Sequence, residues 1–219
     1  MRPMNAPILH HVPQSRSQRV LWLLRELAVE HEVRVWPFDK ILRGPDFLAL
    51  NPVGRVPALE MDGRSYWETG AIIELLCERV SPDILGRPAG HAERADWLIW
   101  LHFAETVSQH AAALTQQHLM LRDPATRSAV ICKLEAARMG KCFDAIEGRL
   151  ARDDATGWLL SGFSAADIAV GQASIMGQRF HRLGERRAMA GWLARCIAQP
   201  AYPDETGLYE REFYEVPDV

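Results

Sequence analysis

The feature that most constrains the fold of this chain is a change of pattern after its first third. Up to about residue 80, short strand-like apolar runs alternate with amphipathic helical segments, whereas residues 91–199 show helical periodicity throughout. A stretch rich in proline and glycine, residues 81–90, separates the two patterns. We therefore expect a mixed α/β domain over residues 1–82, a linker over 83–90 and an all-helical domain over 91–219.

The first part of the chain predicts a definite order of elements. Residues 8–12 indicate a short strand, 17–29 an amphipathic helix and 32–36 a second strand with period-two alternation. Residues 57–67 indicate a hairpin around an Asp-Gly turn, and a helix follows at 69–79. The order is βαβ followed by ββα, which predicts a mixed sheet.

One helix start in the second part is marked by its residues. Ser164 and Asp167 have the spacing of a capping box, in which a hydroxyl and a carboxylate satisfy each other's backbone N–H groups. The remainder of that part divides at Asp123-Pro124, at the 153–157 turn and near Gly184. The tail after residue 199 predicts an extended segment on the surface.

Charge and composition argue against several classes of function. The net charge is −3 with scattered Lys and Arg, so we expect no nucleic-acid partner. No apolar run approaches the roughly 18 residues of a membrane span, and the first residues do not resemble a secretory signal, so we expect no membrane partner and a cytoplasmic protein. The four cysteines form no CxxC and indicate buried thiols, so we expect neither a disulfide framework nor a metal site.

The loop 13–16 joins the first strand to the first helix and could bind a ligand. Open α/β sheets bind ligands at the carboxyl ends of their strands, where helix N-termini also attract anions. The hydroxyl of Ser15 could therefore hydrogen-bond a ligand, and Ser17 could be the N-cap of the helix. A serine in a solvated turn is the alternative for Ser15.

A proline at the entrance to a strand marks a second candidate segment. Pro57 cannot donate to a sheet ladder, and the Val56–Pro57 bond is a candidate for the cis isomer. A cis bond would leave the backbone of Val56 free to pair with an extended ligand. An ordinary trans proline in a turn is the alternative that the spacing alone favours.

The third candidate segment is Glu68-Thr69 at the start of a helix. Thr69 could cap that helix, whose free N–H groups attract a carboxylate, while Glu68 could accept an ammonium group. Together they would suit an amino-acid zwitterion. A capped helix with one acidic residue near its N-terminus is an equally good interpretation.

Over nearly its whole length the chain resembles cytosolic glutathione S-transferases, in particular serine-type members from bacteria and fungi. The resemblance rests on five segments in the family's order: residues 9–27, 51–59, 68–73, 100–105 and 163–168. It implies a thioredoxin-like N-terminal domain followed by an all-α helical bundle domain.

The resemblance also implies roles for individual residues. Ser15 matches the catalytic hydroxyl that contacts the glutathione sulfur, and the position of Arg16 is a cysteine in the beta class. Because the loop has no cysteine, disulfide exchange is disfavoured. Thr69 stands where serine is commoner. The residues implied to bind glutathione are Ser17, Arg55, Val56, Pro57, Glu68 and Thr69.

The function implied is conjugation of the thiolate of glutathione, as co-substrate, to small hydrophobic electrophiles in detoxification. The resemblance further implies a homodimer, with an electrophile held in an apolar cleft near the helix around residues 97–118. Two alternatives stay open: a glutathione-dependent peroxidase or disulfide reductase, and a non-enzymatic binding or regulatory protein with the same fold.

Overall fold

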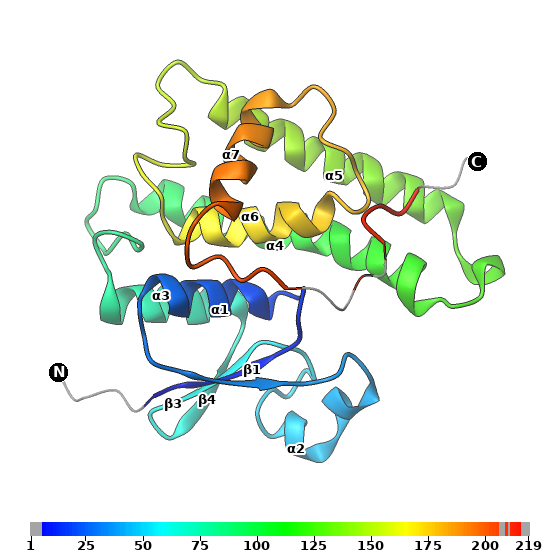
Figure 1. Ribbon diagram of the computed structural model, residues 1–219, viewed down its shortest axis with the longest axis horizontal. Helices are drawn as coiled ribbons and strands as arrows, with labels where there is room; N and C mark the ends of the chain where they lie inside the picture. Colours follow the sequence, from blue (N-terminus) through cyan, green and yellow to red (C-terminus); the bar gives the residue numbers. More distant parts are fainter. Residues whose placement is uncertain (1–5, 206–208, 210, 216–219) are drawn as a thin grey trace. The chain divides into compact units, whose positions relative to one another are not determined.

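The chain forms two compact units, seen in a computed structural model that describes residues 6–205, 209 and 211–215 (Figure 1). One unit is Met1–Ala89 with Pro200–Leu208, and the other is Gly90–Gln199 with Tyr209–Val219. The tail after residue 199 is therefore divided between the units, whereas we expected it within the helical domain. The reason is aromatic packing, because the ring of Tyr202 lies edge-on to Trp22 of the first unit at 5.1 Å between centroids.

The first unit is built on a four-stranded mixed sheet in the order β2-β1-β3-β4. Strand β1 is parallel to β2 and antiparallel to β3, and β4 is antiparallel to β3. The strands are β1 (Ile8–His11), β2 (Glu32–Val35), β3 (Ala58–Met61) and β4 (Arg64–Trp67). The predicted βαβ-ββα order and the mixed sheet are confirmed.

Helices cover both faces of this sheet (Figure 1). Helices α1 (Ser17–Glu26) and α3 (Thr69–Val80) lie on one face, and the short α2 (Pro45–Leu48), preceded by the 3-10 turn η1 (Lys40–Arg43), lies on the other. Most large apolar residues of α1 and α3 are buried, as their helical spacing predicts, and Val80 at the end of α3 is exposed. The other face carries a small apolar cluster made of Val12, Leu42, Phe47 and Ala58.

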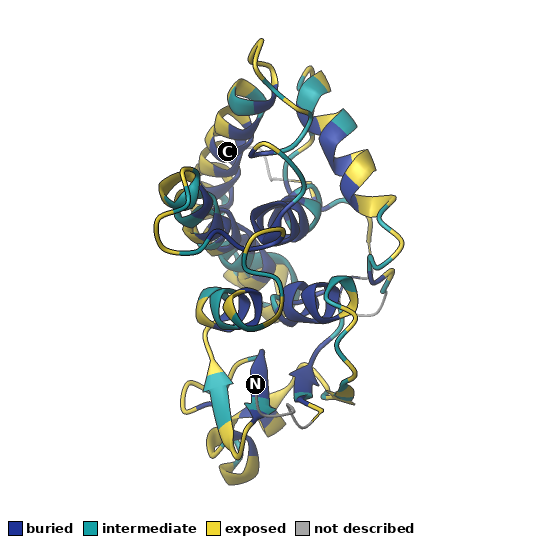
Figure 2. Ribbon diagram, turned by 90° about the vertical axis from the view of Figure 1, so that its left-hand side faces the viewer, coloured by how far each residue is buried: buried dark blue, intermediate teal, exposed yellow. Residues whose placement is uncertain are grey.

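The second unit is helical throughout its regular elements. They are α4 (Arg94–Thr115), the π turn η2 (Gln116–Met120), the 3-10 turn η3 (Pro124–Thr126), α5 (Ala129–Leu150), α6 (Ala165–Gly177) and α7 (Arg187–Ile197). Almost every residue of α6 is buried, whereas α5 has one buried and one exposed side (Figure 2). Gly177 permits this packing, since a Cβ there would lie 2.8 Å from the sulfur of Met139.

The predicted capping box begins helix α6. Ser164 is the N-cap, and both reciprocal hydrogen bonds with Asp167 are present. Asp167 also joins three segments, because its Oδ1 accepts the N–H of Leu159 at 3.0 Å and the indole N–H of Trp192 at 2.9 Å. Its burial raises the pKa of Asp167 to about 6, against the hydrogen bonds, which lower it. This carboxyl group therefore ties α6 to α7 and to the preceding loop.

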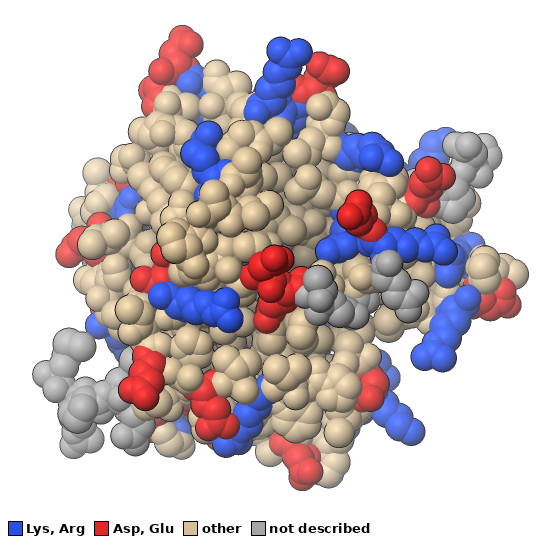
Figure 3. Space-filling model, in the orientation of Figure 1, with Lys and Arg blue, Asp and Glu red and all other residues tan. Residues whose placement is uncertain are grey.

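The described residues include no membrane-spanning helix, and one face of the molecule carries charges of both signs (Figure 3). No helix of the described residues is both long and apolar enough to cross a bilayer. On the face drawn in Figure 3, Lys and Arg side chains lie among Asp and Glu side chains. That face therefore carries no extended field of one sign.

We expect Asp167→Ala to lower the free energy of unfolding by about 2–4 kcal/mol, because it leaves buried N–H donors unpaired. Urea titration followed by circular dichroism measures the loss. The folded-state pKa of about 6 lies above the ordinary value of 3.8, so the native state binds more protons between these values. The stability that proton binding by Asp167 adds is therefore lost as the pH rises toward 6. The difference in free energy of unfolding between the wild type and the variant should be larger at about pH 5 than at about pH 7.

The exposed Asp153 supplies the control for this measurement. Asp153→Ala should change the free energy of unfolding by less than about 0.5 kcal/mol. If the two variants lost the same free energy of unfolding, the hydrogen bonds of Asp167 would contribute no more to stability than an exposed carboxylate does.

Candidate functional site

The sheet register brings the three candidate segments to the same end of the sheet. His10 near the end of β1 pairs with Ala58 at the start of β3, and Ala58 pairs with Trp67 at the end of β4. The loop that follows β1, the loop that precedes β3 and the residues that follow β4 therefore emerge side by side. Segments that are distant in the sequence thus form one surface of the first unit.

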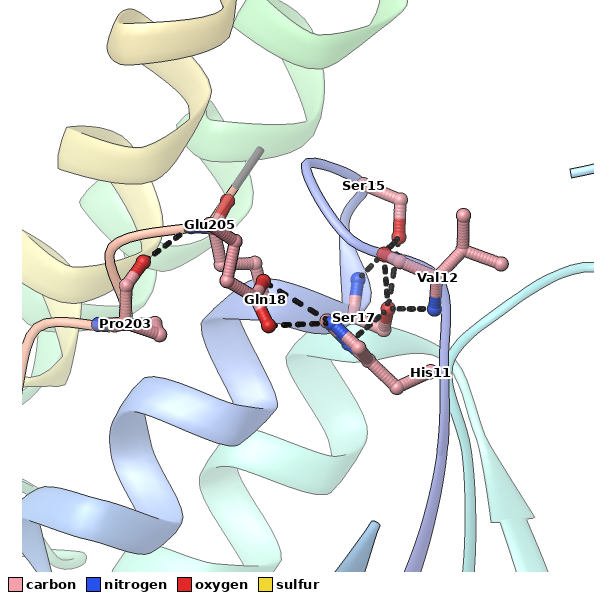
Figure 4. Close-up of polar contacts among 7 residues, drawn as sticks. All are labelled: His11, Val12, Ser15, Ser17, Gln18, Pro203 and Glu205. Carbon is pink, nitrogen blue, oxygen red and sulfur yellow. Dashed lines mark hydrogen bonds and ion pairs between the residues drawn. The ribbon is translucent and has the colours of Figure 1, made fainter. Parts of the chain in front are cut away.

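The loop after β1 turns tightly and holds Ser15 by its hydroxyl (Figure 4). Gln14 takes a φ of 57°, in the left-handed region that is uncommon for residues other than glycine. The Oγ of Ser15 lies 2.7 Å from the carbonyl of Val12 and 2.7 Å from the Oγ of Ser17, and it accepts the N–H of Ser17 at 3.2 Å. Ser15 is 8% exposed and Ser17 is fully buried, so only Ser15 is accessible from outside.

The prediction that Ser17 caps the first helix is wrong. Helix α1 begins at Ser17 itself, Arg16 occupies the N-cap position, and the side chain of Arg16 makes no capping hydrogen bond. The hydroxyl of Ser17 turns back to β1, where it lies 2.8 Å from Nδ1 of His11 and accepts the N–H of Val12 at 3.1 Å. The first turn of α1 also has no acidic residue, so its dipole is available to an anion.

His11 and Glu205 extend this network, and the sequence did not point to either. The ring of His11 is fully buried, and its Nε2 lies 3.0 and 3.1 Å from the two carboxylate oxygens of Glu205 (Figure 4). The segment carrying Glu205 is held by Gln18, whose side-chain amide donates to the carbonyl of Pro203 at 2.7 Å. Two adjacent histidines in a strand indicate that one ring lies on each face of the sheet. No local sequence pattern predicts that the partner of His11 is Glu205, which is 194 residues away.

Asn51 holds the loop that leads into β3, and the Val56–Pro57 bond in that loop is cis. The side-chain amide of Asn51 donates to the carbonyl of Arg55 at 2.5 Å and accepts the N–H of Val53 at 3.0 Å. Among the described residues, none is hydrogen-bonded to the backbone of Val56. The loop therefore presents a free stretch of backbone next to the sheet, beside the exposed side chain of Arg55.

The prediction that Thr69 caps the third helix is also wrong. Thr69 is the first residue of α3, and the N-cap is Glu68, whose side chain makes no capping hydrogen bond. Glu68 has φ 73° and ψ 114°, which is costly for a residue with a Cβ and is typical of functional sites. The N–H groups of the first turn remain without a side-chain cap, and the carboxylate of Glu68 is exposed beside them.

The four cysteines are buried and unpaired. Burial raises the pKa of each thiol, that of Cys77 to about 12. The thiolate is the reactive form of cysteine, and the raised pKa values keep these thiols protonated, so none of them is activated as a nucleophile. Within the described part of the chain, no group of three His, Cys, Asp or Glu side chains is arranged to hold a metal ion.

Several aromatic and histidine side chains of α4 and η2 belong to the interior of the second unit. Trp97 is buried, and Nδ1 of His110 lies 2.7 Å from a carboxylate oxygen of Glu135. The ring of His118 stacks on Phe180 at 5.6 Å between centroids, and burial lowers the pKa of His118. Trp100 and Phe103 of α4 are half-buried and pack edge-on against each other.

Comparison with known proteins identifies the family of the first unit. The family model described as glutathione S-transferase, N-terminal domain, matches residues 15–79. Glutathione S-transferase 3 of Schizosaccharomyces pombe is 35% identical over 98 residues, which are 45% of this chain and 40% of the yeast protein. A glutathione S-transferase-like protein of Aspergillus fumigatus is 28% identical over 197 residues, covering 83% and 86% of the two chains. Residues 15–79 of this chain therefore belong to the N-terminal domain family of glutathione S-transferases, and most of the chain is similar to proteins that carry that name.

The structural comparison agrees with this glutathione S-transferase assignment at the level of the fold. A glutathione transferase homologue from Lodderomyces elongisporus, crystallised with two GSH per subunit, aligns with a TM-score of 0.81 and 19% identity, over 90% of this chain and 96% of that one. The first unit accordingly has the thioredoxin-like fold of the family's N-terminal domain, and a helical region follows it.

We expect the native protein to react with less than about one equivalent of a thiol reagent such as Ellman's reagent within minutes, because its cysteines are buried and un-ionised. In denaturant all four thiols should react, which the absorbance of the released thiolate measures. A cysteine that reacts fast in the native state would contradict this account of the thiols.

Proposed function

We propose that this protein binds reduced glutathione at the end of the first-unit sheet and conjugates its thiolate to small hydrophobic electrophiles. The observation that carries the proposal is the register described above, which places the Ser15 loop, the backbone of Val56 and the uncapped start of α3 side by side. Each of the three supplies a different kind of contact, and glutathione needs all three.

The charges of the site complement those of the tripeptide. Glutathione carries an ammonium and a carboxylate at its γ-glutamyl end and a second carboxylate at its glycine end. Glu68 accepts the ammonium, and the free N–H groups at the start of α3 bind the adjacent carboxylate. The central amide pairs with the N–H and carbonyl of Val56 beside Pro57, and Arg55 attracts the glycine carboxylate.

Ser15 supplies the chemistry at sulfur. A cysteine thiol has a pKa of about 8.5, so only a few per cent is ionised at neutral pH, and each unit of depression corresponds to about 1.4 kcal/mol in favour of the thiolate. The hydroxyl of Ser15 donates to the sulfur anion, and the α1 dipole, with no acidic residue in its first turn, adds to the stabilisation. Thr69 occupies the first position of α3 and contributes its backbone N–H to that site. Ser17, the first residue of α1, instead donates its N–H to the Ser15 oxygen and so holds Ser15 in place.

Conjugation is favoured over disulfide exchange by the composition of the loop. Residues 12–16 contain no cysteine, and the buried thiols elsewhere are un-ionised, so a mixed disulfide with glutathione has no evident partner. We further propose, from the family resemblance, a cytoplasmic homodimer that serves detoxification.

We expect Ser15→Ala to raise the pKa of the bound glutathione thiol by about one unit and to lower kcat/KM for an aryl halide about tenfold at neutral pH, because the anion loses a hydrogen-bond donor. Ultraviolet absorbance of the thiolate, titrated in the binary complex, gives the thiol pKa. Ser161→Ala, at an exposed serine of the second unit, is the control. An unchanged thiol pKa in Ser15→Ala would remove Ser15 from this role.

Glutathione recognition is tested separately with Glu68→Gln. We expect it to weaken glutathione binding about tenfold or more, since a hydrogen bond to a charged group contributes about 1.5–3 kcal/mol. Titration calorimetry measures the dissociation constant, and the thiol pKa of the bound tripeptide should stay at its wild-type value. Glu78→Gln removes a similar exposed carboxylate from the far end of α3 and should leave binding unchanged. Equal affinities in the two variants would exclude the proposed γ-glutamyl site.

A further inference from the structure

The side chain of Asn51 is hydrogen-bonded to the residues on both sides of Val56. Asn51 is only 4% exposed, so these bonds are formed away from solvent. Its Nδ2 donates to the carbonyl of Arg55 at 2.5 Å and to the carbonyl of Pro57 at 3.3 Å. One buried amide group therefore holds both neighbours of the residue whose backbone is proposed to pair with glutathione.

The geometry of the peptide bond converts this contact into a direction for the N–H of Val56. The Arg55–Val56 bond is trans, since Val56–Pro57 is the only cis bond among the described residues. The carbonyl and the N–H of a trans peptide point in opposite directions. Because the carbonyl of Arg55 points to the buried amide of Asn51, the N–H of Val56 points away from Asn51. Within the described part of the chain, no group accepts this N–H.

The oxygen of the Asn51 amide has a separate task at the start of the loop. Oδ1 accepts the N–H of Val53 at 3.0 Å, which closes an Asx turn. The backbone carbonyl of Asn51 accepts the N–H of Gly54 at 2.9 Å, and Gly54 takes a φ of 66°. The acceptor atoms of Asn51 thus shape the beginning of the loop, whereas its two amide donors act on the residues around Val56.

We propose that Asn51 is a positioning residue for glutathione binding. Its two amide donors orient the Arg55–Val56 peptide so that the N–H of Val56 is presented to a carbonyl of the cysteinyl part of the tripeptide, in the manner of an added strand. This inference rests on the glutathione binding proposed above and deepens it by naming the residue that prepares the backbone contact. Asn51 acts only through Val56.

A second side chain holds the same segment and shows what distinguishes Asn51. The hydroxyl of Ser65 on β4 donates to the carbonyl of Leu50 at 2.8 Å, one residue before Asn51. That bond fixes the approach to the loop and leaves the peptide of Val56 untouched. Ser65 and Asn51 both hold the segment in place, but of the two only Asn51 orients the N–H of Val56.

The chemistry at sulfur should not depend on Asn51. Ser15 is held by hydrogen bonds with Val12 and Ser17, and Asn51 takes no part in those bonds. A change at Asn51 should therefore lower the affinity for glutathione and leave the thiol pKa of the bound tripeptide at its wild-type value. This combination separates Asn51 from Ser15, whose substitution should change the thiol pKa.

Two substitutions separate the donors of Asn51 from its acceptor. Asn51→Ser keeps an oxygen that can accept the N–H of Val53, as serine does in such turns, but removes both amide donors. Asn51→Ala removes the donors and the acceptor. We expect each variant to bind glutathione about fivefold more weakly, because one backbone hydrogen bond to the ligand is lost, with kcat for an aryl halide within about twofold of the wild type.

Titration calorimetry gives the dissociation constants, and Ser65→Ala is the matched control, which should bind glutathione as the wild type does. Asn51→Ser combined with Glu68→Gln should weaken binding by the product of the two single effects, because the two residues serve different parts of the ligand. Thermal unfolding of each variant establishes that it is folded at the assay temperature.

Hydrogen exchange of the Val56 amide observes the proposed contact without any substitution. Nuclear magnetic resonance of the wild-type protein, with isotope-labelled valine, should show fast exchange of this N–H in the free protein and slower exchange when glutathione is bound. In Asn51→Ser, saturating glutathione should slow the exchange less than it does in the wild type.

Three results would overturn the role of Asn51. If Asn51→Ser binds glutathione as tightly as the wild type while Asn51→Ala and Glu68→Gln bind it more weakly, Asn51 only closes the turn, and the proposed function stands. If bound glutathione leaves the exchange of the Val56 N–H unchanged in the wild type, the role of Asn51 is likewise wrong. If the wild-type protein fails to bind glutathione, both proposals fall together.

Discussion

The pairing of β1 with β3 is the constraint on which the rest of the first unit depends. Successive side chains of a strand point to opposite faces, so a slip of one residue would exchange the surroundings of His10 and His11. In the observed register His10 contacts Trp36 and Phe47 on one side, while His11 contacts Ser17 on the side of α1. The same register aligns the loops at the end of the sheet, so one set of backbone hydrogen bonds builds both the core and the candidate site.

Polar groups at that end of the sheet are buried and paired, which makes the site rigid. Asn51 holds one loop through its side-chain amide, and Ser17 holds another through its hydroxyl. Buried polar groups are costly unless their hydrogen bonds are made, so each loop has few alternative conformations. The positive φ values of Gln14 and Glu68 fit this interpretation, since strained backbone persists only where its surroundings impose it.

Much of the architecture could be predicted because it depends on local chemistry. The strand and helix periodicities, the breaker-rich linker and the capping box at Ser164 each reflect interactions within a few residues. The two cap assignments at Ser17 and Thr69 failed by one residue for the opposite reason. Which residue is the N-cap depends on the backbone angles at the junction, and these follow from how each loop leaves the sheet.

The sequence by itself therefore determined the order of elements and the division between a mixed sheet and a helical region, and it indicated three candidate segments for ligand binding. The tertiary structure decided which of these segments meet and what supports them. Glu205 reaches His11 across 194 residues only because Tyr202 packs on Trp22 and Gln18 binds the backbone of Pro203. Such a contact leaves no periodic trace in the sequence, since it depends on packing between segments that are distant along the chain.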